Sequence, residues 1–174
     1  MMNKLDFAGL SLKEALDIAI IIEDDARERY QELADQLELH HTGEAAEFFR
    51  FMLDQETKHG NELREYRKRL FGDARVEVDR THIPEVETAD YDAARAFMSP
   101  HQALRVALAN ESRAFDFFDR ALNYVKDNEV AQLFKQLRAD ELDHLNRVQK
   151  VLGDLGPEDA SQPDDFVDEP VSQD

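Results

Sequence analysis

Apolar side chains recur along four long segments of the chain at the 3.6-residue spacing of an amphipathic helix. The first segment shows this pattern at Leu12, Leu16, Ala19, Ile20, Tyr30, Leu33 and Leu37. Together with the flanking turn residues, the pattern predicts helices over about residues 11–39, 44–70, 99–125 and 129–152. We therefore expect an all-α fold made of two helical hairpins.

The starts of two predicted helices carry capping signals. Ser11 and Glu14 have the spacing of a capping box, in which each side chain satisfies a backbone N–H of the other end of the motif. Ser99 and Gln102 repeat this spacing, and Pro100 stands at the first helical position, where its missing N–H costs nothing. These residues place the starts of the first and third helices.

The predicted ends and connections are of two kinds. The second helix is expected to stop at Gly72 and the fourth before Gly153, while residues 40–43 and 126–128 form short turns. Residues 72–98 form a long connection, with a short helix expected around residues 91–97. Two hairpins joined by one long crossover describe a four-helix bundle.

The two hairpins also resemble each other in sequence. Residues 18–34 align without gaps to residues 106–122, and residues 44–61 align to residues 129–146, at offsets of 88 and 85 residues. A duplicated hairpin implies a bundle with pseudo-twofold symmetry. We expect matched positions to face each other across its axis.

Composition and charge narrow the function. The chain of 174 residues contains no Cys, which excludes disulfides, zinc ribbons, rubredoxin-like iron sites and thiol nucleophiles. Its net charge of −18 opposes binding to nucleic acid or anionic lipid. It has no apolar run long enough to span a membrane and no signal-peptide pattern at its start, so a cytoplasmic protein is expected.

The end of the chain differs from the rest. Residues 153–174 are rich in Asp, Glu and Pro and contain no Lys or Arg. This composition predicts a disordered acidic tail, either a solubilising end or an interaction segment, after a helical domain over residues 1–152.

Each predicted helix places one carboxylate on its apolar face, and two of them add an imidazole three residues later. The residues are Glu23, Glu56 with His59, Glu111, and Glu141 with His144, and the repeat pairs them across the two hairpins. A buried carboxylate must be neutralised, paired or bound to metal, because isolated burial of its charge is very costly. Two divalent cations would cancel the four negative charges. Carboxylate and imidazole ligands suit iron or manganese.

Other polar residues give weaker signals. Glu38 and His41 have the same Glu-x-x-His spacing, but they straddle the end of the first helix. Glu62 is expected at an exposed helix edge, although it could form a transient iron site. Tyr30 could hydrogen-bond a ligand, or it could simply pack, as its repeat partner Phe118 must. The remaining histidines are expected at the surface: His40, His41, His82 and His101.

With these residues placed, the chain resembles the ferritin-like di-iron superfamily, in particular the rubrerythrin-type proteins that lack a rubredoxin domain. The resemblance covers about residues 11–152 and rests on the six residues named above. It implies a ferritin-like four-helix bundle with two iron ions, or manganese, in which all six are metal ligands and catalytic residues. The first- and third-helix Glu would be terminal ligands, and Glu56 and Glu141 would bridge the metals.

The resemblance also implies chemistry and partners. Fe(II) would react with dioxygen or hydrogen peroxide, and any electrons would come from a separate donor. Rubrerythrins carry a second Glu three residues after the third-helix ligand; here Ala114 stands there, so the peroxide-linked shift of one iron is not implied. Met52 is expected to face the core, so no haem is predicted. A homodimer is expected rather than a cage, because the tail shows no fifth helix.

Three functions remain open from the sequence. The first is a ferroxidase- or peroxidase-type oxidoreductase in iron handling or oxidative stress. The second is an iron storage or delivery protein acting in a larger shell. The third is a metal-free structural bundle, in which each His satisfies its neighbouring Glu.

Overall fold

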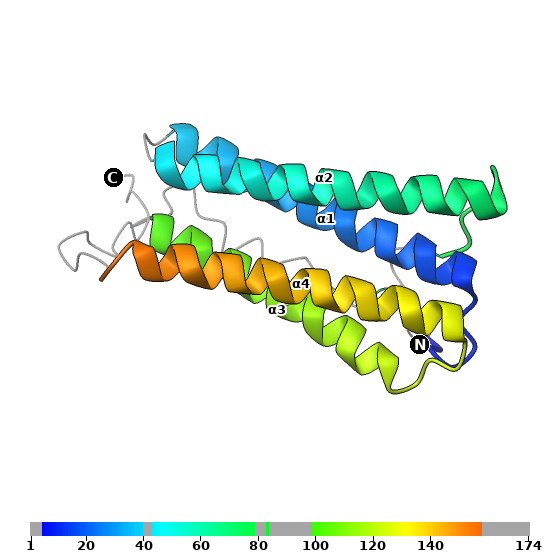
Figure 1. Cartoon of the computed structure of the whole chain (residues 1–174). Coiled ribbons are helices and arrows are strands. Elements are labelled where there is room, and N and C mark those ends of the chain that lie inside the picture. Colours follow the sequence, from blue (N-terminus) through cyan, green and yellow to red (C-terminus); the bar gives the residue numbers. More distant parts are fainter. Residues whose placement is uncertain (1–4, 40–42, 79–82, 84–98, 158–174) are drawn as a thin grey trace, which may run out of the picture.

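Four α-helices make up the computed structural model, which describes residues 5–39, 43–78, 83 and 99–157. The helices are α1 (Leu12–Leu39), α2 (Gly43–Phe71), α3 (Pro100–Leu122) and α4 (Asn128–Asp154), and these described ranges contain no strand. Figure 1 shows two antiparallel hairpins, with α1 lying along α2 and α3 along α4. The all-α bundle of two hairpins predicted from the sequence is confirmed.

Both predicted capping boxes are present. The backbone N–H of Ser11 donates to Glu14 Oε2 at 2.9 Å, and the Glu14 N–H donates to Ser11 Oγ at 3.3 Å. Ser99 Oγ likewise accepts from the Gln102 N–H at 3.1 Å, and Gln102 Oε1 accepts from the Ser99 N–H at 2.9 Å. Pro100 is the first residue of α3, as its fixed φ favours. The polar groups at both helix starts are therefore satisfied locally.

The ends of the helices are only partly as predicted. Gly72 follows the end of α2 with a φ of 57°, the left-handed conformation that glycine adopts without steric cost. Helix α3 ends at Leu122, three residues earlier than predicted, and Asn123 is its C-cap.

The prediction that α4 ends before Gly153 is wrong. The helix continues through Gly153 to Asp154, and Leu155 is its C-cap. A glycine inside a helix costs only about 1 kcal/mol relative to alanine, so favourable neighbours override it. Gly156, with a φ of 73°, takes the left-handed conformation instead.

The buried apolar side chains form two clusters rather than one continuous core. The first cluster includes Leu16, Ile18, Ile22, Leu63, Phe117, Phe118, Phe134 and Leu137. The second includes Tyr30, Leu33, Leu37, Phe49, Met52, Leu104 and Val148. Every helix passes from one cluster to the other, and the candidate carboxylates and histidines stand at the crossing points: after Ile22 in α1, between Met52 and Leu63 in α2, before Ala114 in α3 and after Leu137 in α4. A polar layer therefore separates the two halves of the core.

One buried ion pair fixes the start of the crossover to the first hairpin. Arg67 of α2 donates through Nε to Asp17 of α1, and its Nη2 donates to the carbonyl of Ala74 at 3.0 Å. The Glu77 N–H also donates to Asp17 Oδ2, at 3.4 Å. Pairing and hydrogen bonding of both charges offset the cost of burying them. The chain after α2 is thereby tied back onto α1.

Some predictions fall outside the described residues. These are the turn at residues 40–42, the short helix at residues 91–97, and His40, His41 and His82. Most of the predicted acidic tail also lies outside them, so the division into residues 1–152 and 153–174 stays a prediction. No helix in the described part of the chain combines the length and apolar character needed to cross a membrane.

Candidate metal centre

The polar layer brings together the six residues that the repeat singled out. Glu23, Glu56, Glu111, Glu141 and His144 are each at most 4% exposed, and they come from all four helices. Their burial follows from the helix period, because each one shares a face with the apolar residues one turn before and after it. Predicted site residues from distant parts of the sequence therefore do meet in space.

His144 stands at the centre of three carboxylates. Its Nδ1 atom lies 3.0 Å from Glu56 Oε1, 3.3 Å from Glu111 Oε2 and 3.8 Å from Glu141 Oε2. The imidazole thus joins a carboxylate of the first hairpin to two carboxylates of the second. This position places His144 in contact with both hairpins.

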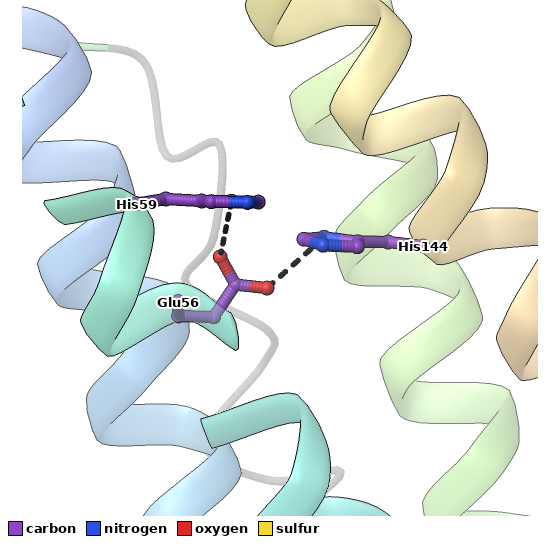
Figure 2. Close-up of side chains that lie close together, drawn as sticks. All are labelled: Glu56, His59 and His144. Carbon is purple, nitrogen blue, oxygen red and sulfur yellow. Dashed lines mark ion pairs between the residues drawn. The ribbon is translucent and has the colours of Figure 1, made fainter. Parts of the chain in front are cut away.

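His59 occupies the edge of the same layer. Its Nδ1 atom lies 3.8 Å from Glu23 Oε2 and 4.0 Å from Glu56 Oε2, and its side chain is 20% exposed, against 3% for His144. Figure 2 shows Glu56 between the two imidazoles, one carboxylate oxygen toward each. The layer is therefore open to solvent on the His59 side.

The pseudo-twofold symmetry expected from the repeat is visible in the two histidines. Their rings stack nearly parallel, with centroids 5.3 Å apart and an interplanar angle of 8° (Figure 2). Because the rings come from matched positions of α2 and α4, the axis between the hairpins passes near them. This matched pair of histidines faces each other, as predicted.

Several oxygen and nitrogen atoms of the layer that could bind a metal have no hydrogen-bond partner among the described residues. In the described part of the chain, five buried atoms of these residues have no hydrogen-bond partner: Glu23 Oε2, Glu56 Oε1, His59 Nδ1, Glu111 Oε2 and His144 Nδ1. His144 Nδ1 and Glu56 Oε1 are in contact, but the pair lacks hydrogen-bond geometry. Buried polar atoms are normally satisfied, so convergent unsatisfied ones indicate a ligand between them.

The electrostatics of the layer favour protonation when no cation is present. Burial raises the pKa of Glu23 well above its ordinary value of 4.5, and the neighbouring carboxylates of Glu56 and Glu141 raise it further. Burial opposes a charged His144, but the carboxylates around it outweigh burial and raise its pKa above 6.5. Burial also raises the pKa of Glu56, yet His144, Glu23 and His59 together lower it by more, so that it falls below 4.5. The raised pKa values favour protonated Glu23 and His144, which partly balance the negative charge of the layer.

The surroundings of the layer are less symmetrical than its donors. The hydroxyl of Tyr30 donates to Glu111 Oε1, across from α1 to α3. Phe118, the repeat partner of Tyr30, is fully buried and has no hydroxyl to offer. Tyr30 thus forms a hydrogen bond with one of the six predicted site residues, and this partner lies in the other hairpin.

Gly60, next to His59, allows a close approach between α1 and α2. A Cβ atom at this position would lie 3.7 Å from Glu23 Cβ and 3.0 Å from Arg64 Nη1. The matched residue in α4 is Leu145, which has a full side chain at this position. The backbone of α2 is thus held close to Glu23.

The residues judged peripheral from the sequence lie outside the layer. Glu62 is exposed and pairs with Lys58 at 3.8 Å, and Glu38 is exposed and pairs with Arg50. His101 is half-buried, and its Nε2 contacts the carbonyl of Gly156 at 2.9 Å.

Sequence reasoning missed Asn110, which is buried directly before Glu111. Its Oδ1 accepts from Arg113, while its Nδ2 has no hydrogen-bond partner among the described residues. The repeat gives Ile22 at the matched position of α1, so the alignment of the two halves carried no sign of a polar residue there.

Comparison with known proteins gives the family. The profile of the family described as rubrerythrin matches residues 14–152. The chain belongs to the rubrerythrin family. This match spans α1 to α4 almost completely and contains all six residues of the polar layer. None of the curated proteins is significantly similar to the chain.

Two solved structures share this fold. An uncharacterized conserved protein from Magnetospirillum magnetotacticum superposes with a TM-score of 0.74 at 29% identity, covering 87% of this chain and 99% of that one. A hypothetical protein from Pyrococcus furiosus gives a TM-score of 0.60 at 25% identity, covering 87% of this chain and 96% of that one.

Proteins of the rubrerythrin family bind di-iron centres, and the residues of this member fit such a group. Two groups of residues each offer three ligand atoms that lie within 4.8 Å of one another. One group is Glu56, His59 and His144, and the other is Glu111, Glu141 and His144. The first set lies on the more exposed side of the layer and the second is buried throughout. Buried carboxylate oxygens and imidazole nitrogens without hydrogen-bond partners are suitable ligand atoms for such a metal pair.

Proposed function

We propose that this rubrerythrin-family chain holds two iron ions with Glu23, Glu56, His59, Glu111, Glu141 and His144, and that it oxidises Fe(II) with dioxygen or hydrogen peroxide. The observation that carries the proposal is the convergence of five buried donor atoms that have no hydrogen-bond partner in the described structure. In a metal-free bundle these atoms have no hydrogen-bond partner among the described residues, and only the contacts between the imidazoles and the carboxylates offset their burial.

Bound iron would supply electrons: two Fe(II) would together give two electrons to hydrogen peroxide, whose O–O bond would break with uptake of two protons, leaving two Fe(III) and two waters. The residues of the chain set the conditions for this reaction. The two apolar clusters on either side of the layer exclude bulk water, and the exposed edge at His59 gives a small oxidant a way in.

Protons are available within the same layer. Glu23 and His144 hold protons in the metal-free protein because their pKa values are raised. Metal ligands must be deprotonated, so binding of the cations releases these protons. Protons in the metal-free layer and cations in the metal-bound layer would each offset negative charge of the buried carboxylates.

The proposal is tested by mixing anaerobically iron-loaded protein with hydrogen peroxide or dioxygen and following Fe(III) absorbance. We expect the wild-type chain to oxidise Fe(II) faster than iron in buffer and Glu56→Leu to lose this acceleration. Glu62→Leu is the matched control, because Glu62 lies on the same helix but is exposed. Equal rates for wild type and Glu56→Leu would contradict the proposal.

Iron storage is a second candidate, favoured by the net charge of −18, which attracts cations. The two functions differ in stoichiometry. A storage protein accumulates iron far beyond the two ions of the polar layer, whereas an oxidoreductase turns over many equivalents of oxidant when a reductant is supplied. Iron retained per chain after repeated additions of Fe(II) and oxidant separates them.

A further inference from the structure

Tyr30 links three helices at the polar layer. Its ring is buried and stacks on Phe49 of α2, with centroids 5.9 Å apart and an interplanar angle of 25°. Its hydroxyl reaches across to α3 and donates to Glu111 Oε1. Because stacking limits the motion of the ring, the hydroxyl has a fixed direction. Tyr30 therefore holds one oxygen of a candidate metal ligand from the opposite hairpin.

The second hairpin repeats the aromatic pair but not the hydroxyl. Phe118 and Phe134 stand at the positions matched to Tyr30 and Phe49, and their centroids are 5.3 Å apart. Both halves thus pair two aromatic rings here, at interplanar angles of 25° and 59°, while only the first half can donate a hydrogen bond from this place. Phe118 gives Glu23 no equivalent of the bond that Glu111 receives.

The bond leaves the two oxygens of Glu111 in different states. Oε1 accepts from Tyr30, while Oε2 has no hydrogen bond and lies 3.3 Å from His144 Nδ1. Glu111 belongs to the group of candidate ligands with Glu141 and His144, which is buried throughout. Oε2 of Glu111, which accepts no hydrogen bond, thus lies beside His144, a residue with which Glu111 would share a cation.

We propose that Tyr30 is a positioning residue that orients Glu111 toward the Glu141–His144 side of the layer and makes this the tighter of two unequal metal positions. This inference rests on the proposed function, since it assumes that the layer binds two cations. The physical reason is preorganisation, because a ligand whose orientation is already fixed loses less conformational freedom when the metal binds. Loss of such an outer hydrogen bond typically lowers metal affinity by about 10–100-fold.

The test is a calorimetric titration of the metal-free protein with Co(II), a divalent ion that does not react with dioxygen at these ligands and that absorbs visible light. We expect two binding steps in the wild-type chain. Tyr30→Phe keeps the ring and removes the hydroxyl, so it should weaken the tighter step about tenfold or more and leave the weaker step unchanged. Tyr66→Phe is the matched control, since Tyr66 lies in α2 outside the layer, under the Arg69 guanidinium.

A second variant separates positioning from general loosening of the fold. In a Glu111→Ala background the hydroxyl has no ligand to orient, so adding Tyr30→Phe should not change Co(II) affinity further. The circular dichroism melt of each metal-free variant shows that it is folded.

The outcomes are distinct. Unchanged binding by Tyr30→Phe, equal weakening of both steps, or the same loss in the Glu111→Ala background would each overturn the role of Tyr30 while leaving the metal site in place. A wild-type chain that binds no Co(II) would overturn both this inference and the proposed function.

Discussion

The two hairpins of this protein share a backbone plan but differ in what surrounds their ligands. Each presents a lone Glu and a Glu-x-x-His to the polar layer, and their histidines stack across the axis. The first hairpin adds the Tyr30 hydroxyl, the partly exposed His59 and the glycine at position 60. In the second, the matched positions hold Phe118, buried His144 and Leu145.

The two halves have kept the same set of candidate metal ligands. They differ in how far their histidines are exposed to solvent and in the hydrogen bonds that orient their carboxylates. The His59 side is open to solvent and the His144 side is closed. Two chemically similar cations would therefore meet different environments. The inequality of the halves is what the following variants test.

The largest difference is expected between the two histidines. His144→Ala removes the group that lies among three carboxylates, which we expect to destabilise the metal-free protein by about 3–5 kcal/mol, as for a buried pair that loses one partner. His59→Ala, at the exposed edge, should cost about 1 kcal/mol or less. Urea unfolding of the two metal-free variants measures this. Equal losses would show that the halves do not differ in burial.

A large effect is also expected at the ion pair that only the first hairpin contains. Arg67→Met leaves Asp17 buried without its main partner, which should cost about 3 kcal/mol or more. When the offsets of 88 and 85 residues are extended beyond the aligned segments, Arg105 and Leu152 stand at the corresponding positions, so no equivalent pair is formed there. The double variant Asp17→Leu/Arg67→Met should recover most of the loss. A double variant as unstable as the single one would contradict this account of the pair.

A smaller effect concerns protons. Because the pKa values of Glu23 and His144 are raised, the folded metal-free protein binds more protons than the unfolded chain above the ordinary values of 4.5 and 6.5. Its free energy of unfolding should therefore fall as pH rises, above 4.5 through Glu23 and above 6.5 through His144. Cation affinity should rise over the same range, by about tenfold per pH unit for each proton released. Calorimetry of Co(II) binding in buffers of different ionisation enthalpy measures the release.

Glu23→Gln is the control for this proton balance. Its side-chain amide cannot titrate, so the variant should release fewer protons on binding any cation that it still holds. Proton release identical to that of the wild type would show that Glu23 is already ionised in the metal-free layer.

The smallest effect distinguishes the two capping boxes. Ser11→Ala and Ser99→Ala should each cost about 1 kcal/mol near neutral pH. Hydrogen bonding to Ser11 lowers the pKa of Glu14 below 4.5, so the first box should weaken as pH falls through that lowered pKa. Gln102 of the second box does not titrate. Thermal melts at neutral and acidic pH should therefore show an acid-sensitive cost only for Ser11→Ala, and Glu14→Gln should remove the sensitivity of that box.

Much of this architecture could be predicted from the sequence because it depends on local patterns. The helical period fixed the four helices, Ser11 and Ser99 marked two of their starts, and the repeat identified the six residues of the layer. The length of α4 could not be predicted so well, because Gly153 is a weak stop signal whose cost the rest of the helix overrides.

The contacts that make the halves unequal were not predictable in the same way. Asp17 and Arg67 are 50 positions apart and have no counterparts in the repeat, so nothing local signals their pairing. Tyr30 stands on the same helix as Glu23, yet it bonds Glu111, because the packing of α1 against α3 decides its direction. Such contacts depend on three-dimensional packing between helices rather than on the period of any one of them.

The most direct test of the central claim is the iron content of the chain after anaerobic loading with Fe(II) and removal of unbound metal. If the polar layer binds two iron ions, we expect about two irons per chain for the wild type and fewer for Glu56→Leu, since Glu56 is the carboxylate between the two histidines. A folded wild-type chain that retains no stoichiometric iron would contradict the central claim.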